Sequence, residues 1–467
     1  MKNTYSRDSF FLFASEGISG VLFAGAGLLV ARTLDVEHFG WFVAAYSLAQ
    51  IFAVFLDVGM GHLVAKELAA GRDLHHRLTN ELLTWRMILL GAVCMVFPLA
   101  SKWVLASPLP NTVVYSLTAG LFLFGLGDFF CWMLKGAKQP LLAAQFKLWT
   151  RGLLLLFCLV ALVGSDRLLG FAAAYGVGGL LTAVVAYFLA KRHLGQIRLL
   201  PLPKQFFVGP LAEVYKLGAL LVVGIFYLKL DVLLVNRFSP ADQVGLMGCA
   251  SRLNDAFRLI PTAAYAAFMP VFSALGIHRE QLAQKFTDVF LILLSVSVMI
   301  ALFGSIFAGP LFSGLLGKTY RESALYFRPL AWGSVFVFGT QLLIGILYAK
   351  SDWATIWKGM GVALGLNAVL NILLIPTVGA LAAPWTKLVS DAMGFYVQAH
   401  GVRQHISVSP RILFLGTTGG ALAGMSLWGG LGHGSLFTQS GGALVLLLVL
   451  FFVVRPDLYF RQRQVFA

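Results

Sequence analysis

Charged side chains are scarce in this chain. Only 12% of its 467 residues are Asp, Glu, Lys or Arg, whereas 59% are hydrophobic. A soluble protein carries about twice that charged fraction, because its surface must be hydrated. The composition therefore excludes an ordinary soluble domain and indicates a protein that lies within a membrane.

Several signatures of catalytic and metal-binding sites are absent as well. The four cysteines stand at unrelated spacings inside apolar runs, so they predict neither a disulfide framework nor a metal site. The nine histidines show no ligand spacing such as HxxxH on one helix face. No phosphate-cradling P-loop motif occurs, which argues against an intrinsic ATPase. We therefore expect a protein that is not an enzyme and has no bound cofactor.

Apolar runs long enough to cross a bilayer recur along the whole chain. A membrane-spanning helix needs about 20 mainly apolar residues. The predicted fold class is an all-α integral membrane protein with about 14 transmembrane helices. The expected spans are residues 9–31, 40–64, 82–105, 111–134, 141–164, 168–190, 213–235, 243–272, 286–309, 325–349, 354–376, 379–400, 411–430 and 439–455.

The formal net charge of +15 is distributed unevenly among the loops. If Met1 is cytoplasmic, most Lys and Arg fall in the inner loops, which is the positive-inside bias. We therefore expect a multi-pass protein with both termini in the cytoplasm. The basic loops would contact anionic membrane lipids, and nucleic acid is not an expected partner.

Two segments of the chain, residues 28–52 and 233–257, align without a gap at an offset of 205. The identical pairs include Leu28/Leu233, Leu29/Leu234, Val30/Val235, Arg32/Arg237, Gly40/Gly245, Ala45/Ala250, Leu48/Leu253 and Phe52/Phe257. Shared hydrophobicity would not supply matches at turn and charged positions. The repeat indicates two duplicated helix bundles around a midplane cavity, which is the architecture of a transporter.

The duplication divides the chain into four parts. We predict an N-lobe of six spans at 1–192, a cytoplasmic linker at 193–212, a C-lobe of six spans at 213–401, and two further spans with a basic tail at 402–467. An even number of spans in each lobe makes this a parallel repeat, with the pseudo-symmetry axis along the membrane normal. A basic, proline-broken linker allows the lobes to rock against each other or serves only as a tether.

Lys147 and Arg151 form the first candidate substrate site. They share one face of the predicted fifth span, which contains no acid. Charged groups at this depth need a partner, a cavity or a function. Two cations on one face suit an anion, and the arginine fork matches phosphate geometry. The alternative is a salt bridge to an acid on another span, such as Asp128.

Arg252 and Arg258 on the predicted eighth span complete the candidate substrate-binding set. They share an arc of that helix with Asp255, which lies angularly between them. Half of the charge on this arc therefore has a structural explanation. If the offset of 205 holds throughout, Lys147 aligns with Asp352 and Arg151 with Ile356, so neither cation is repeated in the second lobe.

Asp231, Asn367, Asn371 and Asp57 are the candidate ion-coupling residues. Asn367 and Asn371 stand one helical turn apart on the predicted eleventh span. Oxygen ligands suit Na⁺ or a proton relay better than a transition metal. Asparagine pairs also act as interhelical hydrogen-bond connections, and Lys229 is an alternative counter-ion for Asp231. We therefore expect use of a Na⁺ or H⁺ gradient.

The stretch from Leu28 to Ala70 resembles the opening of the polysaccharide transporter family. The shared pattern is an apolar first span, an Arg, a short acidic turn ending in Phe/Tyr-Gly, and a second span with Asp-x-Gly. Here these elements are Arg32, Glu37, Phe39-Gly40 and Asp57-Val58-Gly59. The stretch from Leu230 to Phe272 is similar to the central signature of that family. These motifs indicate the wider multidrug/oligosaccharidyl-lipid/polysaccharide exporter superfamily, with a MATE-like fold.

The resemblance implies a flippase of the Wzx type in a bacterial inner membrane. Such a protein moves undecaprenyl-diphosphate-linked oligosaccharide, an O-antigen precursor for example, to the outer leaflet by ion-coupled alternating access. The implied partners are this lipid-linked glycan and membrane lipids, and a glycan polymerase is a further candidate partner. Many O-antigen flippases have twelve spans, so fourteen spans leave the branch open.

Two other functions fit parts of the sequence. A multidrug cation antiporter would use the same fold, but its site should be acidic and aromatic. A polyprenyl-glycan polymerase or ligase should carry catalytic groups in a sizeable outer loop, and the predicted loops are short. The glycan, the coupling ion and the oligomeric state do not follow from the residues.

Overall fold

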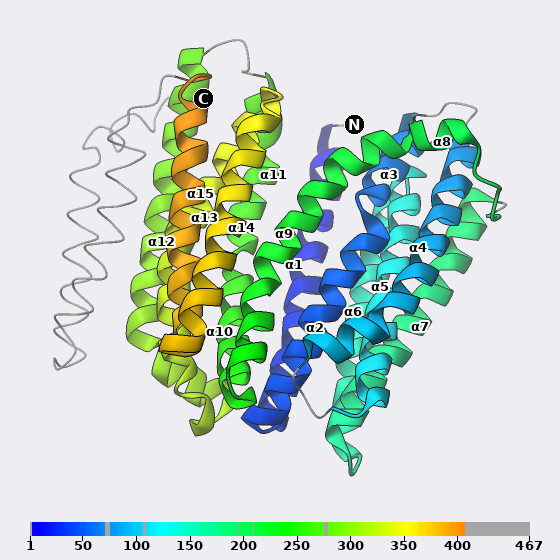
Figure 1. Ribbon diagram of the computed structural model, residues 1–467. Helices are drawn as coiled ribbons and strands as arrows, with labels where there is room; N and C mark the ends of the chain where they lie inside the picture. Colours follow the sequence, from blue (N-terminus) through cyan, green and yellow to red (C-terminus); the bar gives the residue numbers. More distant parts are fainter. Residues whose placement is uncertain are drawn as a thin grey trace. The chain divides into compact units, whose positions relative to one another are not determined.

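The protein is described by a computed structural model over residues 2–70, 75–105, 109–195, 197–208, 210–274 and 279–406, and all regular elements in these ranges are helical. The chain divides into two compact units, unit 1 up to Gly248 and unit 2 from Cys249. The predicted all-α fold is confirmed (Figure 1). The division into lobes at residues 193–212 stays a prediction.

The described residues of unit 1 form nine α-helices, one 3₁₀ turn and the start of a further helix. They are α1 (Lys2–Thr33), α2 (Val36–Asp57), α3 (Met60–Ala70), α4 (His75–Val104), α5 (Asn111–Gly136), α6 (Pro140–Val160), the 3₁₀ turn η1 (Ala161–Val163), α7 (Arg167–Leu194), α8 (Lys204–Val208), α9 (Pro210–Phe238) and α10 (Ala241–Phe257), whose first half belongs here.

Unit 2 contains the end of α10 and the helices that follow it. They are α11 (Leu259–Ala274), α12 (Arg279–Leu316), the 3₁₀ turn η2 (Lys318–Tyr320), α13 (Ser323–Ala349), α14 (Trp353–Val378) and α15 (Ala382–Val402). Helix α13 packs against α12 and α15, and α14 packs against α15. These helices run alongside one another in the yellow-green to orange part of Figure 1.

Nine segments of the described part are long and apolar enough to cross a membrane. Each of the first twelve predicted spans coincides with one helix or with a broken pair of helices. The predicted spans at 411–430 and 439–455 lie outside the described residues. The multi-span character is therefore confirmed, whereas the count of fourteen stays a prediction.

Helices α5 and α7 form the tightest pair in unit 1. A Cβ atom at Gly120 would overlap the carbonyl oxygen of Tyr175, and one at Gly179 would overlap the carbonyl oxygen of Gly120. Small residues of this kind let helices approach closely in a bilayer, where packing replaces the hydrophobic effect as the driving force. This contact fixes α5, and α5 carries part of the site described below.

The second predicted span is broken where α2 meets α3. Val58 adopts the left-handed conformation with φ of 41°, and its N–H still donates to the Val54 carbonyl at 3.0 Å. Gly59 follows with φ of 84°, a region that glycine enters without a Cβ penalty. A Cβ at Gly218 of α9 would overlap the Val58 carbonyl oxygen, so α9 packs directly on the break. The Asp-x-Gly motif is thus a helix break inside a span.

The eighth predicted span is broken as well, by different chemistry. Helix α10 ends at Phe257, Arg258 lies in a turn, and α11 begins at Leu259. Pro261 has no N–H to continue the hydrogen-bond ladder of α10. The span predicted at residues 243–272 is therefore built from two helices.

The first turns of α2 and α10 make a reciprocal contact. A Cβ at Gly40 of α2 would overlap the Ala241 carbonyl oxygen, and a Cβ at Gly245 of α10 would overlap the Val36 carbonyl oxygen. Gly40 and Gly245 are equivalent in the repeat, as are Val36 and Ala241. The glycine shared by both copies is explained by this close approach of two helix ends.

The predicted linker lies against α4 rather than standing free. The backbone N–H of Arg198 donates to Asn80 Oδ1 at 3.2 Å, and that of Leu200 donates to Thr84 Oγ1 at 2.9 Å. Helix α8 then crosses the end of α4 (Figure 1), where the Phe207 ring meets the Trp85 ring edge-on at 5.6 Å. These contacts tie the linker to unit 1.

Candidate functional site

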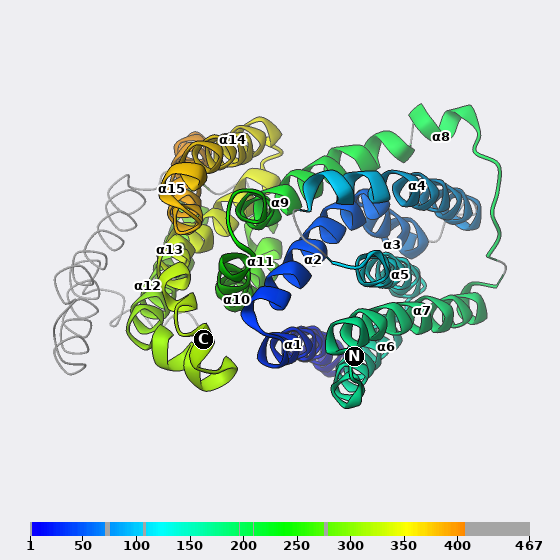
Figure 2. The same cartoon turned by 60° about the horizontal axis from the view of Figure 1, so that its bottom comes forward.

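Lys147 and Arg151, the charged residues of the predicted fifth span, lie on α6. This helix packs against α1, α5 and α7 in unit 1 (Figure 2). The Arg151 guanidinium lies over the Phe23 ring at 4.7 Å and over the Phe124 ring at 4.9 Å. Its Nη2 atom is 3.7 Å from Asp128 Oδ2 on α5. The Arg151 side chain is only 13% exposed, whereas that of Asp128 is 46% exposed.

In this structure Arg151 forms a salt bridge with Asp128, which is the alternative that the sequence left open. The 3.7 Å separation exceeds a hydrogen bond, and half of the carboxylate faces outward, so the ion pair is weak. The two rings hold the guanidinium by cation–π attraction, which leaves its N–H fork able to meet another anion. Arg151 is thus fixed in place but only loosely neutralised.

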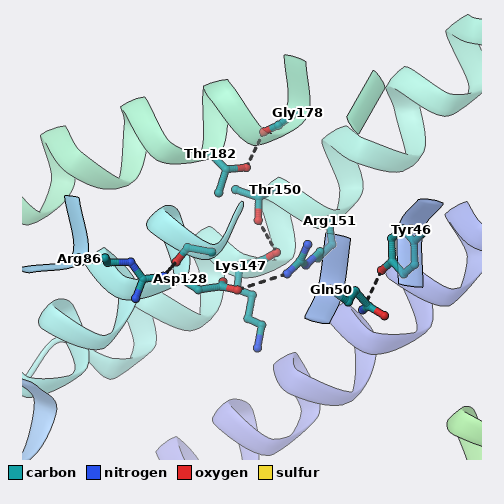
Figure 3. Close-up of polar contacts among 10 residues, drawn as sticks. Tyr46, Gln50, Arg86, Asp128, Lys147, Thr150, Arg151, Gly178 and Thr182 are labelled. Carbon is teal, nitrogen blue, oxygen red and sulfur yellow. Dashed lines mark hydrogen bonds and ion pairs between the residues drawn. The ribbon is translucent and has the colours of Figure 1, made fainter. Parts of the chain in front are cut away.

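Lys147 lies one turn before Arg151 on the same face of α6. Its side chain is half-buried and projects from the helix near Asp128 and Arg151 in Figure 3. Thr150 between them donates its hydroxyl back to the Lys147 carbonyl at 2.9 Å. The predicted cation pair therefore shares one face of α6, with a carboxylate beside it.

A second ion pair in unit 1 surrounds the break between α2 and α3. Asp57, the last residue of α2, accepts a hydrogen bond from Arg86 Nη1 at 2.7 Å. Arg86 Nη2 donates to the Gly125 carbonyl at 2.8 Å, and its guanidinium lies 4.9 Å from the centre of the Phe129 ring. The Arg86 side chain is 3% exposed and that of Asp57 is 29% exposed. Arg86 therefore joins α2, α4 and α5.

Arg86 is a residue that the sequence did not single out. It lies near the start of a predicted span, where a basic residue has an ordinary topological explanation. Asp57, an expected ion-coupling residue, is thereby engaged in a salt bridge in this structure. The pair fixes the polypeptide at the break, because Arg86 also binds α5 on its other side.

A group of aromatic and amide side chains adjoins Arg151. The Phe23 ring, which contacts Arg151, meets the Tyr175 ring edge-on at 6.5 Å, and Tyr175 meets Tyr46 at 5.9 Å. Gln50 on α2 donates from Nε2 to the Tyr46 hydroxyl at 3.3 Å. In the view of Figure 3, the Gln50 and Tyr46 side chains project close to that of Arg151. Tyr46, Gln50 and Asp57 follow one face of α2 at spacings of four and seven residues, a helical signal that the sequence contained.

The second candidate pair of cations lies at the break in unit 2. Arg252 and Asp255 are on the last turns of α10, whereas Arg258 is the residue between α10 and α11. The three do not share one continuous helix face, which corrects the expectation of a common arc. Arg258 Nε is buried and has no hydrogen-bond partner within the described ranges.

The asparagines of the predicted eleventh span lie on α14 and are fully buried. Asn371 Nδ2 donates to Asn367 Oδ1 at 3.2 Å, and the Thr386 hydroxyl on α15 donates to Asn371 Oδ1 at 2.5 Å. These contacts match the hydrogen-bond alternative and join α14 to α15. The same oxygens are also hard ligands of the kind that Na⁺ prefers.

The remaining predicted site residue, Asp231, lies on α9 in unit 1 and is 4% exposed. Unit 1 thus contains Asp57, Lys147, Arg151 and Asp231, and unit 2 contains the other four, Arg252, Arg258, Asn367 and Asn371. Among the described residues, no group of three or more His, Cys, Asp or Glu side chains forms a metal site.

Comparisons with known proteins connect this geometry to a family and a fold. The profile of the family described as "Polysaccharide biosynthesis protein" matches residues 6–276 of the chain. A search of curated protein sequences finds no match.

Solved structures of transporters share the fold. A lipid II flippase, MurJ, in an inward closed conformation has a TM-score of 0.71 at 12% identity, covering 97% of this chain and 99% of the other. An inward-facing multidrug resistance MATE family transporter of the MOP superfamily has a TM-score of 0.66 at 13% identity, covering 83% and 94%. A MOP superfamily transporter from Pyrococcus furiosus, with a binding pocket of reversed polarity, has a TM-score of 0.62 at 12% identity, covering 85% and 94%.

Proposed function

Because the chain belongs to the polysaccharide biosynthesis protein family and has the fold of MOP superfamily transporters, we propose that it is a flippase for lipid-linked glycan. The substrate proposed is undecaprenyl-diphosphate-linked oligosaccharide, moved from the inner to the outer leaflet for surface polysaccharide synthesis. The location proposed is a bacterial inner membrane, with both termini in the cytoplasm. The relatives are transporters and flippases rather than enzymes, and no catalytic residue is assigned.

The arrangement of Arg151 carries this proposal. A diphosphate offers several oxygens that accept hydrogen bonds from a guanidinium fork, and Lys147 one turn away adds a second positive charge. The present partner of Arg151, Asp128, is held at 3.7 Å and is half exposed, so an incoming diphosphate competes with a weak ion pair. The polyprenyl tail would remain in the bilayer while the polar head crosses along unit 1.

Ion coupling is proposed to involve Asp57 and Asp231 in unit 1, and Asn367 and Asn371 in unit 2. The buried oxygens of the asparagine pair fit Na⁺ in kind, and a bound cation would replace the hydrogen bond donated by Thr386. The test is flipping in proteoliposomes with a Na⁺ gradient, an H⁺ gradient or neither. Flipping that is independent of both gradients would remove this part of the proposal.

The central experiment measures glycan flipping by purified protein in proteoliposomes. The substrate is a fluorescent undecaprenyl-diphosphate glycan, and its arrival in the outer leaflet is followed by a membrane-impermeant quencher. Arg151→Ala should lower the initial rate at least tenfold, because it removes the only rigidly held fork of donors on that face of α6. Lys147→Ala should lower it less, because a lysine acts as a point charge.

Lys138→Ala is the matched control. Lys138 is an exposed cation on the turn between α5 and α6, outside the site. Its rate should equal that of the unmodified protein. If Arg151→Ala, at equal abundance and thermal stability, flips glycan as fast as Lys138→Ala, the proposed diphosphate site is wrong.

One observation favours a second candidate, a multidrug cation antiporter. The Asp128 side chain is 46% exposed and lies near Arg151, which contacts the Phe23 and Phe124 rings. Carboxylates and aromatic rings suit organic cations. Overexpression should then raise resistance to cationic drugs, and Asp128→Asn should abolish that gain. Loss of surface glycan in a deletion strain, with unchanged drug sensitivity, would favour the flippase.

A further inference from the structure

Gln50 has a buried hydrogen-bond acceptor that no described residue uses. Its Nε2 donates to the Tyr46 hydroxyl, but Oε1 has no partner within the described ranges and is shielded from the surface. A buried acceptor without a partner costs stability, and such atoms in native proteins often mark a functional site. Within the described ranges, no group of the chain donates to this amide oxygen.

The surroundings of Gln50 restrict what that donor is. A chain of ring contacts through Phe23 and Tyr175 connects the Arg151 guanidinium to Tyr46, the partner of Gln50, so the region is cationic and aromatic. A metal ion is disfavoured beside this positive charge. A phosphate is disfavoured at Oε1 itself, because phosphate oxygens and the amide oxygen are both acceptors.

Hydroxyl and N-acetyl groups fit this position well. A sugar hydroxyl donates to Oε1, and the Tyr46 hydroxyl can both accept and donate. The neighbouring rings offer apolar faces for the carbon skeleton of a sugar. The two pairs of side chains therefore suit different groups (Figure 3). Arg151 and Lys147 provide positive charge for an anion, whereas Gln50 and Tyr46 provide an uncharged acceptor and a phenol hydroxyl.

We propose that Gln50 and Tyr46 form a saccharide subsite that recognises the diphosphate-proximal sugar of the substrate while Arg151 and Lys147 bind its diphosphate. This inference rests on the proposed flippase function and adds to it a place where the glycan is read. The hydrogen bond from Gln50 Nε2 to Tyr46 orients the amide. Oε1 is shielded in this conformation, so the sugar would reach it after the surrounding side chains move apart. Gln50 is thus the selecting residue and Tyr46 positions it.

The test separates glycan recognition from diphosphate binding. Binding of short-chain polyprenyl diphosphate without sugar is compared with binding of the same lipid carrying one sugar and three sugars, in nanodiscs. The glycan increment is the Kd of the bare lipid divided by that of the glycosylated lipid. Gln50→Leu should lower this increment about twofold to tenfold, the loss of one or two hydrogen bonds, and should leave the bare-lipid Kd unchanged.

Two further variants sharpen the result. Tyr46→Phe removes the hydroxyl that orients the amide, so the increment should fall by less than in Gln50→Leu. Gln398→Ala is the matched control. Gln398 on α15 is buried, and its Oε1 atom also has no partner in the described part of the chain. Unlike Gln50, it packs on Gly359. Its increment should equal that of the unmodified protein.

The outcomes distinguish the two levels of the argument. If Gln50→Leu leaves the increment unchanged, Oε1 is satisfied by a resident water and the subsite is wrong, although the flippase proposal stands. If Gln50→Leu weakens bare and glycosylated lipids equally, Gln50 serves the fold alone and the subsite is again wrong. If the unmodified protein binds no polyprenyl diphosphate, the proposed function itself fails. Where Gln50→Leu does not fold, Gln50→Asn withdraws the amide by one methylene and gives the same reading.

Discussion

The ion pair at the break between α2 and α3 gives the sharpest prediction about stability. Arg86→Met replaces the guanidinium with an apolar chain of similar length. The change removes the charge-assisted hydrogen bond to Asp57, the bond to the Gly125 carbonyl and the cation–π contact with Phe129. The Asp57 carboxylate then stays largely buried without a counter-ion, and the broken span loses its attachment to α5.

The size of the effect follows from burial. Arg86 is 3% exposed and Asp57 29% exposed, so solvent screens the pair only slightly. Removing one partner of a buried pair costs about 3–5 kcal/mol, because the other charge is left uncompensated. Asp57→Asn should cost less than Arg86→Met, because Arg86 keeps its bonds to Gly125 and the Phe129 ring. The double variant removes both charges and should cost less than the sum by about 2 kcal/mol.

The assay is the free energy of unfolding of the purified protein in mixed detergent micelles, measured for the native sequence, both single variants and the double variant. For a unit of this size, 1 kcal/mol corresponds to a shift in Tm of about 2–4 °C, so Arg86→Met should lower Tm by about 10 °C. Single-variant costs that add to within about 0.5 kcal/mol would refute the reasoning, because they would mean that the two charges do not interact.

Two further predictions concern packing and pH. Gly218→Val places a side chain where the Val58 carbonyl oxygen lies, so α9 must move away from the break between α2 and α3. The free energy of unfolding should fall by about 1–3 kcal/mol. An unchanged Tm would contradict this close packing of α9 on the break. At the α13–α14 turn, burial alone would raise the pKa of Asp352, but hydrogen bonds from His405 and Thr355 outweigh it and lower the pKa below 3.8. A carboxylate whose pKa is lower in the folded state stabilises the protein at any pH above its unfolded-state pKa. This stabilisation is lost as the pH falls through the folded-state pKa. Asp352→Asn should therefore lower Tm at pH 7, and the Tm of the variant should fall less steeply than that of the native protein below about pH 4. Thermal melts of both proteins over a series of pH values test this prediction.

The sequence predicted the fold better than the interruptions within it. Hydropathy located the first twelve spans, because lipid imposes a helix on any apolar run of that length. The breaks at Val58 and Arg258 were missed, because both lie inside apolar stretches that still satisfy a span. The pattern Asp-x-Gly was noticed only as a resemblance. Its physical meaning, a left-handed C-cap covered by α9, depends on a tertiary contact with Gly218.

The candidate site shows the same limit. The helical spacing of Lys147 and Arg151 correctly placed them on one face, but it could not decide which acid faces them. Arg86 was overlooked, because its partner lies on a different helix, 29 residues earlier in the chain. Gln50 could have been found from its position on the face of α2 that carries Asp57. Its unused acceptor, however, becomes visible only when every neighbouring donor is in place.

The reciprocal contact of Gly40 and Gly245 has a consequence for the origin of the chain. Gly40 faces the Ala241 carbonyl and Gly245 faces the Val36 carbonyl. Both the two glycines and the two carbonyl positions are equivalent in the repeat. Two identical subunits related by a two-fold axis make contacts of this isologous kind. A chain of half this length would already carry a self-complementary surface at that helix end, which is how a homodimer begins. Fusion of such a dimer keeps the contact and releases every other position to change independently in the two halves.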